Sequence, residues 1–417
     1  MSTESSWKAI PQRFYPYAVY LYSLLLPLPN HLKNIGLFLL LGLYVLNVIR
    51  QKKISLPSLY FSPYALLLLY LVVCAGSILV SDNKKYAADY LVLQLTVPIL
   101  PLLLYRKLTY SERNRALQVF SFSTFCLSVY ALVDIFRIYL TQLPQPLVSW
   151  NEIDWVLISY QMPRNINFHA PYYSLYIGIC LLIHITFLHQ NFLRKNYKNL
   201  LLHAGACLFF LSFQALLSSR TALFATLLVI TLGAGYQAIQ TNRWKLLLAV
   251  LVVVASSGYV IYERIPYLKM KMSQSAGHEE RRLMWQASVH LLQEHPLYGV
   301  GSGDRKEAIT QVYRKIGFTE GLNGYYNSHN QFLEWGVSFG WIGILTLTTV
   351  FVALLGWSLQ RKQYLLLGFL AVFILCCITE SLLQRQAGVL LFSYMVSLLG
   401  FAPKEEVKQK DSLSHSF

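Results

Sequence analysis

A histidine stands at the start of one of the long apolar runs. His329 and Asn330 immediately precede the run 331–359, which also contains the spaced glycines Gly340 and Gly343. Histidine titrates near neutral pH and can take a proton from a hydroxyl, and entry into an apolar helix removes part of its water. We interpret His329 as a candidate general base. The alternative is a histidine that only hydrogen-bonds a carbonyl where the helix begins.

Three arginines are candidates for binding a diphosphate. Arg220 lies in the short polar turn 218–221 between two apolar runs, and Arg281 and Arg282 open an amphipathic stretch. Guanidinium groups can form forked hydrogen bonds to phosphate oxygens. The alternatives are contact with lipid headgroups for Arg220 and a solvated helix start for the pair. The sequence does not choose between Arg281 and Arg282.

Further ionisable residues lie near the ends of other apolar runs. Arg164 and His169 precede the run 170–190, while Glu380 and Arg385 lie where the last two runs meet. Ionisable residues near a membrane boundary are functional candidates, so we include them as supporting residues. A Glu380–Arg385 salt bridge that fastens one loop is the alternative. The sequence shows no paired carboxylates or Cys/His cluster with metal-ligand spacing, so we expect neither a metal nor a cofactor.

The composition predicts a membrane scaffold for these residues. The 417 residues are 55% hydrophobic and 13% charged, whereas about 25% is the usual charged share in soluble proteins. A membrane span needs about 20 apolar residues. We predict an all-α integral membrane protein with twelve spans, at 14–29, 35–49, 59–80, 86–104, 116–140, 170–190, 199–217, 221–240, 244–262, 331–359, 364–382 and 386–402.

The charges of the loops predict the orientation. The net charge is +16, and basic residues such as Arg50, Lys52 and Lys53 gather in short loops on one side of the predicted membrane. Such loops are normally cytoplasmic, which places both termini inside and accounts for the charge without a nucleic-acid partner. Membrane lipids are the expected surroundings.

The predicted domain organisation follows from these spans. Spans one to nine occupy residues 1–262, one large outer loop follows at 263–330, spans ten to twelve occupy 331–402, and a polar tail covers 403–417. The outer segments 141–169 and 263–330 are too long to be simple connections, so function is expected there. Within the large loop, 281–294 predicts an amphipathic helix with Met284, Ala287, Ser288 and Leu291 on one face.

The motif around the histidine resembles that of a known family. His329 and Asn330, nine further residues, and Gly340-Trp-Ile-Gly343 fit the H[NSQ]-x9-G-x-x-G pattern of bacterial O-antigen ligases. The turn at Arg220 and the stretch from Arg281 and Trp285 to residue 301 are also similar to the superfamily of these ligases and Wzy-type polymerases. The resemblance covers roughly residues 160–400.

The resemblance implies an activity and a location. It implies a glycosyltransferase of the GT-C type in the bacterial inner membrane, which acts in lipopolysaccharide biosynthesis without a metal and inverts the anomeric centre. The donor would be a polysaccharide on undecaprenyl diphosphate, and the acceptor a sugar hydroxyl of the lipid A core at the periplasmic face. His329 would be the base, while Arg220 and one arginine of the 281/282 pair would hold the diphosphate.

Three other functions remain open from the sequence. The same donor site could serve a Wzy-type polymerase of O-antigen or exopolysaccharide, or a protein O-oligosaccharyltransferase that modifies Ser or Thr. A transporter of lipid-linked polysaccharide would also have many spans. It is expected to carry ionisable residues at the centre of the membrane, whereas Asp89, Asp134, Arg137 and Glu380 lie toward the predicted outer ends of their spans.

Overall fold

The computed structural model describes residues 3–52, 54, 56–59, 62–142, 154–242, 244–264 and 276–401. These residues form helices joined by turns, with no strand among them. The all-α prediction is confirmed for this part of the chain. The predicted tail at 403–417, and parts of the outer segments 141–169 and 263–330, lie outside the described residues.

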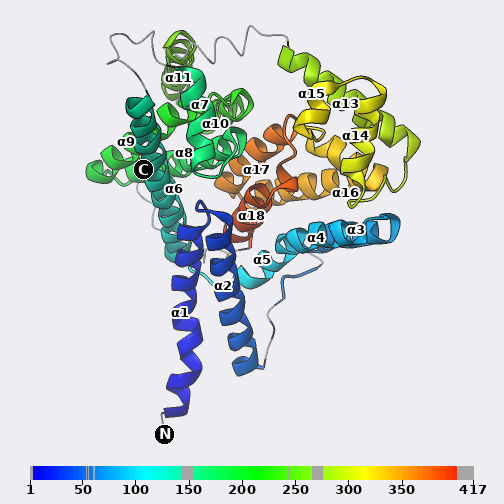
Figure 1. Ribbon diagram of the computed structural model, residues 1–417. Helices are drawn as coiled ribbons and strands as arrows, with labels where there is room; N and C mark the ends of the chain where they lie inside the picture. The colour runs from blue at the N-terminus through cyan, green and yellow to red at the C-terminus, as the bar shows by residue number, and fades with distance from the viewer. Residues whose placement is uncertain are drawn as a thin grey trace.

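Each predicted span coincides with one helix or with two consecutive helices (Figure 1). These are α1 (Thr3–Leu25), α2 (Asn30–Gln51), α3 (Tyr64–Val80), α4 (Lys84–Gln94), α5 (Thr96–Leu104), α6 (Tyr110–Gln142), α8 (Ala170–Leu193), α9 (Tyr197–Leu216), α10 (Arg220–Thr241), α11 (Trp244–Arg264), α16 (Gln331–Gln360), α17 (Tyr364–Cys377) and α18 (Gln386–Met395), the last continued by η3 (Val396–Gly400).

Seven of the described helical segments are long and apolar enough to cross a membrane. They are α2, the consecutive pair α4 and α5, α6, α8, α9, α10 and α16, and four shorter apolar helices lie within α3, α11, α17 and the α18–η3 segment. The chain therefore has the composition and helix lengths of a membrane protein. The count of twelve spans stays a prediction.

Two predicted spans are interrupted. The run 86–104 divides at Leu95 into α4 and α5, just before Pro98, which has no N–H to continue the helical hydrogen bonds. The run 364–382 stops being α-helical after Cys377, and the chain unwinds over residues 378–385 with a short 3-10 turn, η2 (Leu382–Gln384). We call residues 378–385 the unwound segment.

Side chains of neighbouring helices satisfy the backbone of the unwound segment. The Leu383 N–H donates to Gln331 Oε1 at 2.6 Å, and Gln94 Nε2 donates to the Leu383 carbonyl at 2.9 Å. Tyr172 Oη donates to the Ser381 carbonyl at 2.9 Å. Non-helical backbone is tolerated at membrane depth only where protein or water supplies such partners. These bonds hold the segment in one conformation.

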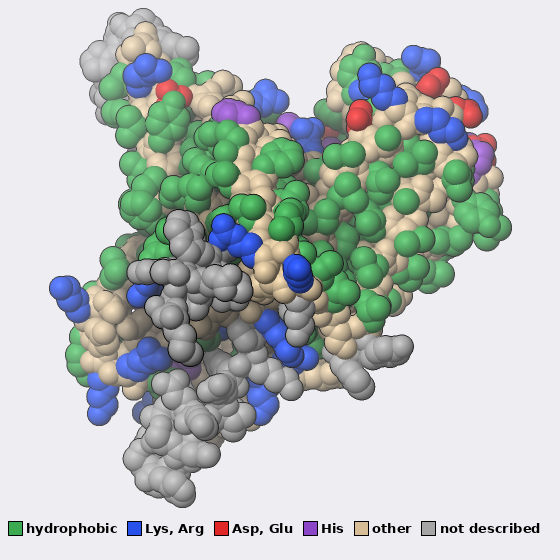
Figure 2. Space-filling model, turned by 90° about the horizontal axis from the view of Figure 1, so that it is seen from below, with side chains coloured by type: hydrophobic (Ala, Val, Ile, Leu, Met, Phe, Trp, Pro, Cys, Tyr) green, Lys and Arg blue, Asp and Glu red, His purple; other side chains and the backbone are tan. Residues whose placement is uncertain are grey.

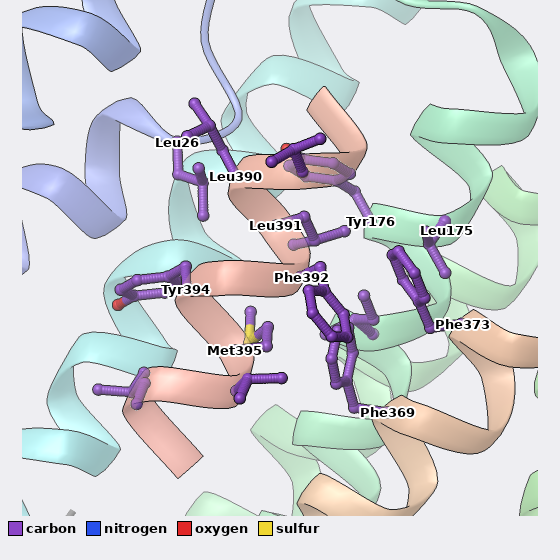
Figure 3. Close-up of a cluster of buried hydrophobic side chains, with 14 of the residues drawn as sticks. Leu26, Leu175, Tyr176, Phe369, Phe373, Leu390, Leu391, Phe392, Tyr394 and Met395 are labelled. Carbon is purple, nitrogen blue, oxygen red and sulfur yellow. The ribbon is translucent and has the colours of Figure 1, made fainter. Parts of the chain in front are cut away.

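The core of the molecule surrounds α18. Figure 3 shows Leu391 and Phe392 of this helix among Leu175 of α8 and Phe369 and Phe373 of α17. All residues of α18 from Gly388 to Met395 are buried, and the helix packs against α5, α8 and α17. A helix that is apolar all around its circumference is stable only when other helices surround it. The unwound segment therefore leads directly into the centre of the fold.

The described part of the predicted outer loop, from residue 276 to residue 330, forms a helical unit with its own core. It contains α13 (Ala276–Glu294), α14 (Arg305–Lys315) and α15 (Thr319–Gly324), which lie together beside α16 in Figure 1. The sequence predicted that one face of the amphipathic helix α13 packs inward, and this is confirmed. All four predicted residues of that face are buried: Met284, Ala287, Ser288 and Leu291. The helix begins five residues earlier than predicted. Its apolar side chains pack against α14, and Val337 of α16 joins the same cluster.

A further helix occupies part of the predicted outer segment 141–169. α7 (Trp155–Asn165) begins at Asp154, whose Oδ1 accepts a hydrogen bond from the Leu157 N–H at 2.9 Å. Ser159 of α7 donates to the Leu216 carbonyl at 2.7 Å. This bond places α7 beside the turn between α9 and α10.

Much of the outer surface is apolar. Large hydrophobic side chains such as Phe38, Phe122, Leu208 and Phe224 are more than half exposed. Figure 2 shows one face of the molecule, where hydrophobic side chains cover much of the surface, Lys and Arg side chains are scattered among them, and acidic and basic side chains gather together at the upper right. Apolar surface on this scale is stable in lipid rather than in water.

Candidate active site

The backbone around His329 has a defined and unusual conformation. His329 has a φ of 42°, in the left-handed region, and its N–H donates to Asn327 Oδ1 at 3.0 Å. Asn330 caps α16, because its Oδ1 accepts hydrogen bonds from the Phe332 and Leu333 N–H groups at 2.9 and 3.1 Å. Residues other than glycine seldom adopt this backbone conformation unless their surroundings impose it. The imidazole is therefore held at the start of α16.

A buried ion pair stabilises the turn that carries His329. Glu334 Oε1 lies 3.1 Å from Arg305 Nε, and Glu334 Oε2 accepts a hydrogen bond from the Ser328 N–H at 2.9 Å. Arg305 also donates to the Ser302 carbonyl at 2.6 Å and lies 4.7 Å from the ring centroid of Tyr90. This pair was not predicted from the sequence. The sequence feature that could have indicated it is a carboxylate, Glu334, one turn into an apolar helix.

A break in α16 receives the glycine-rich segment 296–303. Gly340 has φ 63° and ψ −156°, which interrupts the helical hydrogen bonds. The Val300 N–H donates to the Val337 carbonyl at 2.8 Å, and the Trp341 N–H donates to the Pro296 carbonyl at 2.7 Å. A Cβ on Gly340 would lie 2.4 to 2.5 Å from backbone atoms of residues 296–297. Gly340 thus allows this close approach of two backbones.

The adjacent arginines of α13 point to different surroundings. Arg281 Nη2 lies 3.6 Å from Glu380 Oε1, and its side chain is 29% exposed. Arg282 pairs with Glu279 on the same helix, and its side chain is 55% exposed. The buried face of α13 explains the difference, because Arg281 lies one turn before Met284 and Arg282 lies a further 100° around the helix.

Arg220 is the first residue of α10 and follows a tight turn. Ser218 in this turn has a φ of 49°, and its Oγ lies 3.1 Å from Ser159 Oγ of α7. Thr379 Oγ1, in the unwound segment, donates to Thr221 Oγ1 at 2.8 Å. These contacts bring the turn that carries Arg220 next to Glu380.

Glu380 links two of the other candidate residues. It is 8% exposed, and its Oε1 and Oε2 lie 3.6 Å from Arg281 Nη2 and 3.2 Å from His329 Nδ1, respectively. In the described part of the chain it forms these pairs and none with Arg385, so the alternative of a Glu380–Arg385 salt bridge is wrong. A carboxylate at Nδ1 favours the tautomer whose Nε2 is free to accept a proton.

A pocket of about 170 Å³ opens beside Glu380. Residues 218–222 form one wall, and Arg281, Pro171 and Glu380 contribute to the others. Two arginines from different helices therefore line one small space, which can accommodate an anionic group. His329 is outside this lining and is joined to the pocket through Glu380.

The other predicted residues border this region without entering the pocket. Arg164 ends α7 and stacks on Tyr160, with 3.7 Å between its Cζ and the ring centroid. His169 precedes α8, and Arg385 precedes α18. Partial burial, followed by the charges of Arg385 and Arg164, lowers the pKa of His169. The structure therefore brings every predicted residue except Arg282 to the pocket or to its surroundings.

Comparison with known families identifies the central part of the chain. Residues 205–348 match the O-antigen ligase family model. The match confirms the resemblance found in the sequence, and it includes Arg220, Arg281 and His329. Glu380 lies beyond the matched residues. No curated protein matches the chain. The matched region thus contributes most of the residues that line the pocket, and Pro171, α17 and the unwound segment contribute the rest.

Proposed function

We propose that the protein is an O-antigen ligase, a metal-independent GT-C-type glycosyltransferase of the bacterial inner membrane. It transfers a polysaccharide from undecaprenyl diphosphate to a sugar hydroxyl of the lipid A core at the periplasmic face. The observation that carries this proposal is the Arg281–Glu380–His329 arrangement at the edge of the Arg220 pocket. It combines positive charge for a diphosphate with an oriented base for a hydroxyl.

In this mechanism the arginines stabilise the leaving group. Arg220 and Arg281 bind the donor diphosphate, and their charges offset the negative charge that grows as the bond between the anomeric carbon and the diphosphate oxygen breaks. The electron pair of that bond stays on the diphosphate. Diphosphate is already a good leaving group, so two guanidinium groups supply the electrostatic stabilisation that an acid or a metal supplies in other transferases.

His329 activates the acceptor. Its Nδ1 faces Glu380 Oε2 at 3.2 Å, so in this mechanism the carboxylate keeps the proton on Nδ1. Nε2 then takes the proton of the acceptor hydroxyl while that oxygen attacks the anomeric carbon from the face opposite the diphosphate. Attack from that face inverts the anomeric centre. Glu380 orients the imidazole and stabilises the imidazolium that forms, as a carboxylate does in hydrolase triads. The outer helical unit covers the reacting sugars and limits their hydrolysis by water.

Transfer to defined acceptors tests this proposal. The full-length protein in nanodiscs is given an undecaprenyl-diphosphate-linked polysaccharide and one of three acceptors: lipid A core, a second lipid-linked glycan, or a Ser/Thr peptide. We expect transfer to lipid A core. We expect His329→Ala to lower the rate about 10²- to 10⁴-fold with donor binding retained, and Arg220→Lys to keep partial activity. Elongation of the lipid-linked glycan alone would identify a polymerase instead, and modification of the peptide alone a protein transferase.

A further inference from the structure

Three exposed basic side chains lie outside the pocket, on segments next to those that line it. Arg164, His169 and Arg385, which we call the rim cluster, come from the end of α7, the residue before α8 and the residue before α18, and all three are exposed. Arg385, Arg164, Glu380 and His329 all act electrostatically on His169. The rim cluster is therefore close to the proposed base, although none of its members lines the pocket.

Contacts between the supporting segments hold the rim cluster together. Tyr172, one turn after His169, donates to the Ser381 carbonyl in the unwound segment at 2.9 Å. Gln386, next to Arg385, hydrogen-bonds to Asn34 of α2. Stacking on Tyr160 restricts the position of Arg164. α8 is thus joined to the unwound segment that precedes α18, and α7 packs against α8.

A fourth cation lies beneath the rim cluster. Lys33 is 1% exposed, and its Nζ lies 4.7 Å from the ring centroid of Phe168 and 3.2 Å from Asn30 Oδ1. A lysine ammonium buried beside an aromatic ring and an amide, rather than beside a carboxylate, adds positive potential to the surface above it.

Among the residues that the structure describes, the basic side chains of this region outnumber the acidic ones. In the described part of the chain, neither Arg164 nor Arg385 forms an ion pair, while Glu380 is already engaged by Arg281 and His329. Asp134, which accepts a hydrogen bond from Asn165, pairs with Arg137. Basic groups held close together without a carboxylate repel one another, and an anionic ligand relieves this repulsion.

We propose that the rim cluster binds a phosphate group of the acceptor glycolipid and thereby brings the acceptor hydroxyl to His329. This inference rests on the proposed function, in which Arg220 and Arg281 hold the donor diphosphate. The acceptor must then reach His329 from outside the pocket, where the rim cluster lies. Arg164 and Arg385 form charge-assisted hydrogen bonds to the anion, and His169 adds one N–H donor.

Acceptor kinetics test this proposal. The full-length protein is studied in nanodiscs of zwitterionic lipid with two acceptors: lipid A core with its phosphates, and the same preparation after dephosphorylation. In the Arg164→Gln/Arg385→Gln variant, we expect the KM for the phosphorylated acceptor to rise at least about tenfold. The KM for the dephosphorylated acceptor and for the donor should remain unchanged. Arg194→Gln, at the opposite end of α8, is the matched control and should behave as wild type.

Each remaining outcome contradicts the proposal. Equal changes with both acceptors would show that the arginines do not recognise the anion. A raised donor KM would assign them to the diphosphate, and an effect confined to nanodiscs that contain anionic lipid would assign them to headgroups.

Binding of both acceptors to His329→Ala protein, with and without the two arginine substitutions, is measured in parallel, without transfer. Selective loss of phosphorylated-acceptor binding in the double arginine variant would support the rim cluster even if wild-type transfer, and with it the proposed function, failed.

Discussion

At the scale of single residues, Glu380 has the most connections in the candidate site. It is nearly buried, and each of its carboxylate oxygens faces a different basic group, Arg281 and His329. Burial of a carboxylate is costly without partners of this kind. The same residue therefore orients the proposed base and keeps one arginine beside the pocket.

Replacing Glu380 should separate catalysis from donor binding. In Glu380→Gln the side chain keeps its shape, but it loses the negative charge that stabilises an imidazolium at His329. We expect kcat to fall about 10²-fold or more while the affinity for the donor diphosphate stays the same or increases, because Arg281 loses a competing carboxylate. Single-turnover transfer and donor titration measure the two effects. Unchanged kcat would remove Glu380 from the mechanism, and Glu380→Asp should restore part of the rate.

The two arginines of α13 form a matched pair for mutagenesis. We expect Arg281→Ala to weaken binding of an undecaprenyl-diphosphate donor about tenfold or more, because this guanidinium faces the pocket. Arg282→Ala should bind the donor as wild type does, since Arg282 pairs with exposed Glu279. Donor titration of both variants in nanodiscs tests this, and a larger loss in Arg282→Ala would reverse the assignment.

The register of these arginines could have been predicted more sharply from the sequence. The predicted buried positions of α13 include Met284 and Ser288, and Arg281 precedes them by three and seven residues, on the same helical face. The pairing of His329 with Glu380 could not be predicted in this way. Those residues are 51 positions apart, and their contact depends on the unwound segment, which apolar composition alone does not reveal.

At the scale of elements, two departures from regular helix position the site. The unwound segment places Glu380 at the edge of the pocket, and the break at Gly340 docks residues 296–303 against α16. The hydrophobic runs predicted where the helices occur, but they did not predict these interruptions. The interrupted runs stay apolar, and at the interruptions their backbone hydrogen bonds are made with side chains and with backbone groups far away in the sequence. The short α7 was missed for a related reason, since its apolar stretch is too brief to count as a span.

Gly340 and Gly356 on the same helix allow a controlled test of the break. Gly340→Ala should be destabilising, because an L-residue is strained at this φ and ψ and its Cβ would meet the backbone of residues 296–297. We expect a loss on the order of 2 kcal/mol or more, seen as a lower thermal midpoint in detergent. A Cβ on Gly356 would meet no atom within 4 Å, so Gly356→Ala should be neutral or slightly stabilising. Similar midpoints for the two variants would contradict the docking role of Gly340.

At the scale of the whole molecule, the loops predicted to lie outside the membrane meet at one end of the helix bundle. Residues 218–222, Pro171 and Glu380 line one pocket, and Ser81 and Asp304 join the turn after α3 to the outer helical unit. The assignment of that end to the periplasm rests on the positive-inside rule and remains a prediction.

Labelling from one side of the membrane tests the predicted orientation. Tyr325, near His329, is 66% exposed. Lys198 is exposed near the start of α9, which is the end of that helix away from the turn that carries Arg220. We expect an impermeant thiol reagent to label Tyr325→Cys in intact spheroplasts and Lys198→Cys only after permeabilisation, with the parent protein as control for its native cysteines. The reverse pattern would place His329 in the cytoplasm.

The central claim is that one imidazole and two guanidinium groups surround the charged head of a carrier lipid. A structure of the full-length protein with bound undecaprenyl diphosphate measures this most directly. We predict phosphate oxygens within hydrogen-bonding distance of Arg220 and Arg281, with His329 facing the space where an acceptor hydroxyl approaches the donor sugar. Phosphates bound far from both arginines, or on the far side of the bundle from His329, would contradict the account.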